Sequence, residues 1–234
     1  MVHSGVSAVV TNWNRADSLP ACLRSILAQR DVDVEIIIVD DASTDNSLEV
    51  IKRYKKAYPE TIRAFETHES VTQNICLPAN IGFKRARHPY VVVNPSDILH
   101  ILPTNFKKFL EVIGRDEKAF ACPSSVNLAD LKWKEICPAG CVKTEWIRAI
   151  GGFDERMKGW GANEPDLFMR LQMIGVRAVK ADALVMHVDR ILGEVRSTRK
   201  YNPENDRIHA ENVRNNMAKP NAEWGEHPFL EEIT

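Results

Sequence analysis

The acidic residues best suited to chemistry lie at the ends of apolar runs and in one glycine-rich segment. Asp41 ends the run VEIIIVDD, and Asp97 follows the valines of VVVNPSD. The glycine-rich segment GGFDERMKGWGANEPD, residues 151–166, brings further carboxylates. Carboxylates can hold Mg²⁺ or Mn²⁺, which prefer oxygen ligands, or can take a proton from a bound hydroxyl group. Either use requires these acids to gather in one place, which depends on the elements that carry them.

Strand and helix patterns alternate over the first hundred residues. Two apolar runs predict buried strands, and each is followed by apolar residues at helical spacing, in residues 17–29 and 43–58. This order predicts an α/β fold with a mainly parallel sheet that helices cover on both faces. Because ligands bind such sheets at the carboxyl ends of the strands, one rim is predicted from residues 11–15, 40–44 and 94–97.

The second half of the chain has a less regular pattern. Residues 118–142 show little periodicity and predict irregular loops with short strands. Residues 165–175 predict a helix with Pro165 at its first position, which makes Glu164 the residue before the helix. Residues 177–190 predict one or two strands, and a last helix is predicted to start at Asn202 and Pro203.

Composition excludes several classes of protein. The formal net charge of −1 gives no electrostatic reason to expect a nucleic acid or an anionic membrane as a partner. We expect no membrane-spanning segment and no signal peptide, and the five scattered cysteines do not suggest a disulfide framework. Neither a dinucleotide fingerprint nor a phosphate loop is present in the sequence. We therefore expect a cytoplasmic protein with reduced cysteines.

Four ordered motifs carry a resemblance to a known family. The opening SAVVTNWNRADSLPACLRSILAQ with VEIIIVDDASTDNSLEVI resembles that of family 2 glycosyltransferases of the GT-A fold. NIGFKRAR, NPSDIL and GGFDERMKGWGANEPDLFMRL resemble later motifs of the family in the same order. The resemblance implies a single domain with a Rossmann-like, mixed but mainly parallel sheet flanked by helices. Residues 1–195 would form the catalytic part and residues 196–234 a C-terminal helical extension.

The resemblance also implies an activity. Such enzymes invert the sugar as they transfer it from a nucleotide-sugar donor to a hydroxyl group, and we expect a UDP-linked or other pyrimidine-linked donor. The expected acceptor is a glycan or a glycolipid. Membrane contact would then be peripheral.

Nucleotide-binding residues follow from the same motifs. Trp13 would stack on the base, and Asp41 would accept a hydrogen bond from the base edge, while Asp40 would anchor the loop. In isolation, the tryptophan could instead lie in an interface and the acids could cap a helix. The remaining nucleotide contacts implied by the resemblance are Thr11, Arg15, Asn80, Arg87 and Ser96.

The metal motif departs from the family pattern. Relatives carry two or three acids there, whereas this chain has Asn94 and Ser96 and keeps only Asp97. His187 lies where many relatives place a late histidine ligand, so Asp97 and His187 would hold Mg²⁺ or Mn²⁺ together with the diphosphate. One lost carboxylate about 4 Å from a cation costs up to ~4 kcal/mol of attraction at a dielectric near 20, so metal binding should be weak without the nucleotide. The alternatives are a helix-capping Asp97 and a buried His187.

The acceptor side of the site is expected in and after the glycine-rich segment. Aligned on the family, Glu164 would be the base, and Asp166 is a second candidate that could instead pair with Arg170 one turn later. Trp160 would stack on an acceptor sugar or lie in the core. Asp154 would contact the acceptor or brace the loop.

Two other functions remain open from the sequence. The eroded metal motif would suit a catalytically weak module that only binds nucleotide-sugars. A nucleotidyltransferase shares the general architecture, but it would need a basic, glycine-rich N-terminal loop, and residues 11–18 carry a single arginine.

Overall fold

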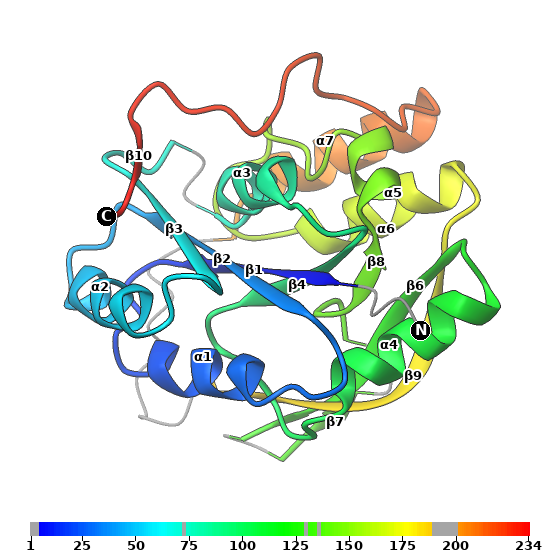
Figure 1. Cartoon of the computed structure of the whole chain (residues 1–234). Helices are drawn as coiled ribbons and strands as arrows, with labels where there is room; N and C mark the ends of the chain where they lie inside the picture. Colours follow the sequence, from blue (N-terminus) through cyan, green and yellow to red (C-terminus); the bar gives the residue numbers. More distant parts are fainter. Residues whose placement is uncertain (1–4, 72–73, 129–130, 135–136, 189–200) are drawn as a thin grey trace.

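The computed structural model describes residues 5–71, 74–128, 131–134, 137–188 and 201–234. In this part of the chain a ten-stranded sheet has helices on both faces (Figure 1). The strands are β1 (Val6–Asn12), β2 (Val34–Asp41), β3 (Ile62–Thr67), β4 (Tyr90–Pro95), β5 (Ile98–His100), β6 (Ala119–Asn127), β7 (Trp133–Lys134), β8 (Cys141–Lys143), β9 (Arg177–His187) and β10 (Leu230–Glu232). The helices are α1 (Leu19–Leu27), α2 (Ser47–Ala57), α3 (Cys76–Arg85), α4 (Asn105–Arg115), α5 (Thr144–Ala149), α6 (Asn163–Met173) and α7 (Pro203–Arg214).

The sheet is mixed and its central part is parallel, which confirms the predicted fold class. Its order is β10-β3-β2-β1-β4-β8-β6-β9-β5, with β7 paired to β6 off this path. The neighbours β3, β2, β1 and β4 all run parallel. Successive side chains of a strand point to opposite faces. Accordingly, Ala8 and Val10 pack in the core under α1, α2 and α4, whereas Val9 packs under α3, α5 and α6.

The predicted rim is formed as expected. Thr11 lies opposite Pro95, and Asn12 lies opposite Asp40, so the ends of β1, β2 and β4 meet at one edge. The backbone N–H of Ser96 donates to Thr11 O at 3.0 Å and holds the turn after β4 against β1. The three segments that the sequence placed together are therefore neighbours.

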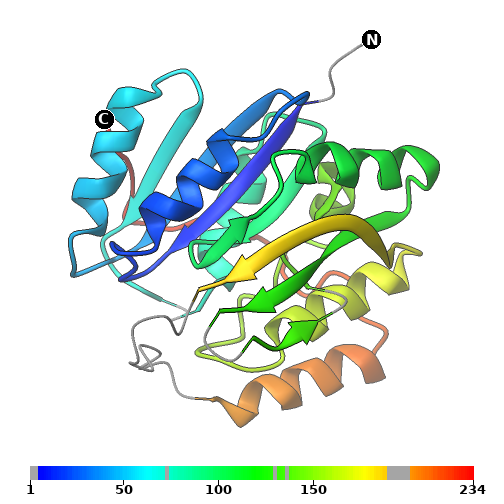
Figure 2. The same ribbon diagram turned by 90° about the horizontal axis from the view of Figure 1, so that it is seen from below.

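The prediction of irregular structure over residues 118–142 was wrong for its first part. Residues 119–127 form β6, which runs parallel beside β9 (Figure 2). The sequence pattern did not predict this strand because Pro123 lies within it, and a proline, which has no N–H to donate to a neighbouring strand, argues against a central strand. The structure accommodates Pro123 at a register shift, because Cys122 lies opposite Lys180 and Ser124 lies opposite Leu184, so that a bulge leaves Pro123 and residues 181–183 of β9 unpaired.

The start of α6 also differs from the prediction. The helix begins at Asn163 after Ala162, whose φ of +55° marks the turn into it. Pro165 is therefore the third helical residue, and Glu164 lies inside the first turn. A proline fits there because the first N–H groups of a helix have no partner within it.

The residues after 200 pack on the same sheet. α7 starts at the predicted place, and Asn202 caps it by accepting from Glu204 N at 3.1 Å. The chain then returns across α3, and β10 pairs antiparallel with β3, which places Ile233 in the core. The division at residue 195 stays a prediction. Among the described residues, no helix is long and apolar enough to cross a membrane.

Candidate active site

A cavity opens at the rim where β1, β2 and β4 end. The start of α3 forms its other wall with Asn74, Ile75 and Pro78. Most of the predicted nucleotide and metal residues line it, namely Thr11, Trp13, Arg15, Asp41, Ser96 and Asp97. Residues that come from three separate loops thus meet in one depression.

Asp40 anchors the loops around this cavity, as predicted. Its Oδ1 accepts from Asn12 Nδ2 and from Ser43 Oγ, both at 2.7 Å. Burial raises the pKa of Asp40, and these donors oppose that rise. The next residue, Asp41, is left to line the cavity, and its Oδ2 accepts from Ser70 Oγ at 2.6 Å.

The structure brings Asp97 and His187 together. Ile98 of β5 lies opposite His187 of β9, so His187 Nε2 stands 3.2 Å from Asp97 Oδ2. Arg15 Nη2 is 3.7 Å from the same oxygen. Burial alone would raise the pKa of Asp97, but the hydrogen bond and charge of His187, with the charge of Arg15, hold it below its ordinary value. Asp97 caps no helix, because α4 starts after Thr104.

A carboxylate beside an imidazole fits a divalent cation that also binds phosphate oxygens. Asp97 is ionised and lines the cavity, and Ser96 adds a neutral oxygen next to it. The described residues hold another group of close potential ligands, Glu66, His68 and Glu231. None of these three lines the cavity, so the donor set that fits a metal there is Asp97 with His187.

Asn94, the first position of the eroded acidic motif, belongs to the core. It is fully buried, and its Oδ1 accepts from Nε2 of the buried His100 at 2.8 Å. Asn105 Nδ2 lies 3.1 Å from the other ring nitrogen. Burial lowers the pKa of His100 to about 3, so its ring is neutral. A neutral amide at position 94 suits this neutral ring.

Glu164 lies half-buried in the first turn of α6, where the charges of Asp97 and His187 act on it. Burial raises its pKa above the ordinary 4.5, and the negative charge of Asp97 raises it further. Its own backbone N–H and the charges of Lys134 and His187 oppose this rise. Glu164 and Asp97 therefore share one electrostatic environment, in which Glu164 is a stronger base than an exposed glutamate.

Asp166 is in a different environment. It is fully buried, and Arg170 Nε donates to its Oδ2 at 2.6 Å. Its Oδ1 accepts from Asn212 Nδ2 at 2.9 Å and lies 3.3 Å from His209 Nδ1. The pair with Arg170 is the one that the i,i+4 spacing suggested. These contacts leave Asp166 shielded from any substrate.

Asn80 and Arg87 do not reach the cavity. Asn80 binds the backbone of the glycine-rich segment, since its Nδ2 donates to Phe153 O at 2.9 Å and its Oδ1 accepts from Phe153 N at 2.7 Å. A Cβ on Gly152 would lie 2.0 Å from that Oδ1, so glycine is required there. Arg87 is exposed, and its backbone N–H donates to the Glu35 carboxylate. Glu35 lies near the start of β2, so Arg87 is at the opposite ends of the strands from the cavity.

The two remaining acceptor candidates differ in exposure. Asp154 is 1% exposed, and it pairs with Arg156 Nη2 at 2.8 Å, so it braces the loop. Trp160 is 61% exposed and lies edge-on to Tyr201, with ring centroids 5.6 Å apart. Trp160 is thus open to a ligand, whereas Asp154 is not.

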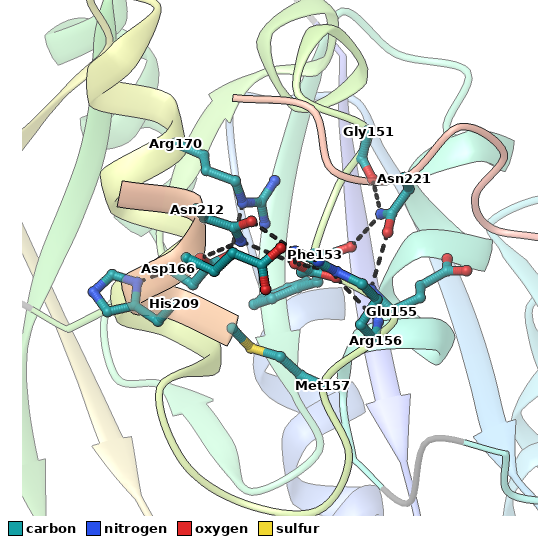
Figure 3. Close-up of polar contacts among 12 residues, drawn as sticks. Gly151, Phe153, Glu155, Arg156, Met157, Asp166, Arg170, His209, Asn212 and Asn221 are labelled. Carbon is teal, nitrogen blue, oxygen red and sulfur yellow. Dashed lines mark hydrogen bonds and ion pairs between the residues drawn. The ribbon is translucent and has the colours of Figure 1, made fainter. Parts of the chain in front are cut away.

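Sequence reasoning missed two central residues of this region. Arg170 is fully buried and ties α6 to the glycine-rich segment by donating to Gly152 O at 2.7 Å (Figure 3). Asn212 of α7 bonds both Asp154 and Asp166. Arg170 was visible only as a helical ion-pair partner, and Asn212 gave no signal, because a polar residue in a polar helix predicts exposure.

The chain thus combines a mixed, mainly parallel sheet, a cavity at the carboxyl ends of its central strands and a carboxylate–histidine pair beside that cavity. The sequence model described as "Glycosyl transferase family 2" matches residues 7–166. The chain therefore belongs to glycosyl transferase family 2, and glycosyl transfer is the activity of that family.

Curated relatives agree with this assignment over short stretches. The chain is 43% identical over 58 residues to the uncharacterized glycosyltransferase alr2836 of Nostoc, covering 25% of this chain and 18% of the relative. It is 33% identical over 100 residues to the poly(ribitol-phosphate) beta-N-acetylglucosaminyltransferase TarP of Staphylococcus aureus, covering 41% of this chain and 29% of the relative. The chain thus spans less than a third of either protein.

Solved structures share the fold. S. aureus TarS 1-349 in complex with UDP matches with a TM-score of 0.66 at 15% identity, over 88% of this chain and 63% of that chain. GalNAc-T7 with UDP, GalNAc and Mn²⁺ matches with a TM-score of 0.73 at 14% identity, over 90% and 48%. At such identities the likeness establishes the GT-A fold alone.

Proposed function

We propose that the protein is an inverting glycosyltransferase that moves a sugar from a UDP-sugar to a hydroxyl group of a glycan or glycolipid. The observation that carries this proposal is the gathering of Trp13, Asp41 and Asp97 around one cavity, with Glu164 in the field of Asp97. The bound UDP in the structures of TarS and GalNAc-T7 supports the choice of nucleotide.

Trp13 and Asp41 would bind the base at one end of the cavity. An aromatic ring that stacks on a base contributes about 1–3 kcal/mol. The Asp41 carboxylate can accept a hydrogen bond from the imide N–H of a pyrimidine, and Ser70 holds it in place. Thr11 and Ser96 line the same cavity.

Asp97 and His187 would hold Mn²⁺ or Mg²⁺ at the diphosphate end. When bound, the cation neutralises charge on the departing diphosphate. Arg15, whose guanidinium lies 3.7 Å from Asp97, brings a fixed positive charge to the same place. The low pKa of Asp97 keeps this ligand ionised at neutral pH.

Glu164 would take the proton of the acceptor hydroxyl while the oxygen attacks the anomeric carbon opposite the diphosphate. A single displacement of this kind inverts the sugar. The raised pKa of Glu164 makes it a better proton acceptor than an ordinary carboxylate. The exposed Trp160 offers an apolar face to the acceptor ring.

A module that binds the donor without transferring it is the second candidate. The observation that favours it is the loss of acids from the metal motif. Asn94, at the first acidic position of that motif, is buried and bonds His100 instead of facing the cavity. The two candidates differ in whether bound donor is consumed.

Calorimetric titration of nucleoside diphosphates with Mn²⁺ and with EDTA tests the site. We expect UDP to bind tightly only with Mn²⁺, and the Asp97→Ala variant to lose the dependence on the cation. Asp182→Ala, which removes an exposed acid of β9, is the matched control. Equal binding in EDTA would refute the metal role of Asp97, and the absence of binding by any nucleotide would refute the proposed function.

A further inference from the structure

Helix α7 turns a polar face toward the loop that precedes Glu164. We call residues 151–162 the glycine loop. Positions 205, 208, 209 and 212 are spaced i, i+3, i+4 and i+7, so they share one side of the helix. Asn205 and Asn212 are fully buried on that side, with Ile208 between them. A buried helix face is normally apolar, so two buried asparagines require partners.

The partners of Asn205 are backbone groups in the second half of the glycine loop. Its Oδ1 accepts from Lys158 N at 3.0 Å, and its Nδ2 donates to Lys158 O at 3.0 Å and to Gly161 O at 2.9 Å. The backbone N–H of Asn202 donates to Trp160 O at 2.8 Å. The loop has little secondary structure of its own, so the start of α7 satisfies its backbone.

The partners of Asn212 stand on the two sides of Trp160 and Glu164 in the sequence. Its Nδ2 donates one hydrogen to Asp154 Oδ2 and the other to Asp166 Oδ1, both at 2.9 Å. Its Oδ1 accepts from Arg156 Nη2 at 2.6 Å (Figure 3). All three polar positions of the amide are therefore used. A carboxylate has no donor and alanine has neither donor nor acceptor, so neither can replace Asn212 here.

The tail after α7 repeats the pattern at the start of the loop. Asn221 Nδ2 donates to Gly151 O at 2.9 Å and to Phe153 O at 2.7 Å, and its Oδ1 accepts from Glu155 N at 3.1 Å. Asn221 thus bonds the loop at residues 151, 153 and 155, Asn212 at residues 154 and 156, and Asn205 at residues 158 and 161. Figure 3 shows the contacts of Asn212 and Asn221.

We propose that α7 belongs to the active site. Its Asn205 and Asn212 are positioning residues, which hold the glycine loop so that Glu164 and Trp160 are correctly placed. The inference rests on the proposed function, in which Glu164 is the base. It extends the site beyond residue 166, where the family match ends. Neither asparagine lines the donor cavity, so their loss should impair transfer while leaving nucleotide binding intact.

The test compares Asn205→Ala, Asn212→Ala and Asn212→Asp with wild type and with Asn215→Ala. Asn215 is an exposed asparagine at the end of the same helix, which makes it the matched control. Hydrogen–deuterium exchange of the glycine-loop peptides, UDP affinity with Mn²⁺ and UDP-sugar consumption are measured for each protein.

We expect exchange of the loop amides to be at least tenfold faster in both alanine variants, with the central strands unchanged. UDP affinity should stay within threefold of wild type, and kcat should fall at least tenfold with an unchanged KM for the donor. Asn212→Asp should be worse than Asn212→Ala, because it sets a third carboxylate beside Asp154 and Asp166. Asn215→Ala should match wild type.

Loop exchange at the wild-type rate in both alanine variants would overturn the proposal. UDP affinity that falls in step with kcat would also overturn it, because α7 would then support the whole fold. Asn205→Ala, which affects only loop backbone contacts, decides the outcome where the Asn212 variants fail to fold. If the wild-type protein consumes no UDP-sugar, the proposed function fails. Faster hydrogen exchange of the glycine loop in the alanine variants would then still support the role of α7 in holding that loop, and unchanged exchange would refute it.

Discussion

Glu164 and Asp166 lie two residues apart in α6, yet their replacement should have opposite consequences. Asp166→Ala should lower the free energy of unfolding, because it removes the ion-pair partner of the fully buried Arg170. Glu164→Gln should leave stability nearly unchanged and abolish most of the transfer, because Glu164 is only half-buried and is proposed to be the base. The two variants separate the structural carboxylate from the catalytic one.

The buried contacts set the magnitude for Asp166→Ala. Removing one partner of a buried ion pair costs about 3–5 kcal/mol, because the other charge stays buried without compensation. That is a large part of the roughly 5–15 kcal/mol by which domains are stable. In a chain of this size each kcal/mol shifts the melting temperature by about 2–4 °C, so we expect a decrease of about 6–20 °C. The amide of Asn212 also loses one of its two acceptors.

For Glu164→Gln we expect a change in the free energy of unfolding within about 0.5 kcal/mol, as for replacements that remove no buried contact. Loss of a general base lowers kcat by about 10²–10⁴. Denaturant and thermal unfolding give the stabilities, and release of nucleotide from a UDP-sugar gives the rates.

One pattern would refute the assignment. If Asp166→Ala kept its stability within about 1 kcal/mol while kcat fell 100-fold and Glu164→Gln remained active, Asp166 would be the base, and the buried network around it would not exist in solution.

Three further outcomes follow. Trp13→Ala should weaken UDP binding by about 5- to 150-fold, which corresponds to ~1–3 kcal/mol of lost stacking, measured by calorimetry. Transfer should decrease as the pH falls through the raised pKa of Glu164, because the base must be ionised, so the acid limb of kcat/KM should lie above pH 4.5 and be missing from the residual activity of Glu164→Gln. Asn94→Asp should lower stability at pH 7 by about 1–3 kcal/mol without raising Mn²⁺ affinity. That loss should shrink toward pH 5 in urea unfolding, because His100, whose pKa burial holds near 3 in the wild type, can be protonated beside a new carboxylate.

Much of the fold follows from short-range patterns. The apolar runs and the helical spacing over the first hundred residues predict a parallel sheet, and the carboxyl ends of β1, β2 and β4 form the expected rim. β6 was missed because Pro123 breaks the local pattern, whereas a bulge accommodates it in the sheet. Local sequence propensity includes the effect of the proline, but it does not include the neighbouring strand β9, whose pairing with β6 accommodates the bulge.

The candidate site divides in the same way. The sequence by itself determined the order of the motifs and the loops that meet at the rim, because side-chain period and strand direction fix those. Only the tertiary structure decided which polar residues face the cavity. Asn94 and Asp166 turn into the core, and Arg87 lies at the far edge of the sheet.

The physical reason is the distance along the chain between the partners. Asp97 meets His187 because β5 pairs with β9, and Asp166 meets Asn212 because α7 packs on α6. Each contact joins residues more than 40 positions apart. A carboxylate in the sequence is equally compatible with a ligand, a base or a buried brace, and the residue packed against it determines which of these it becomes.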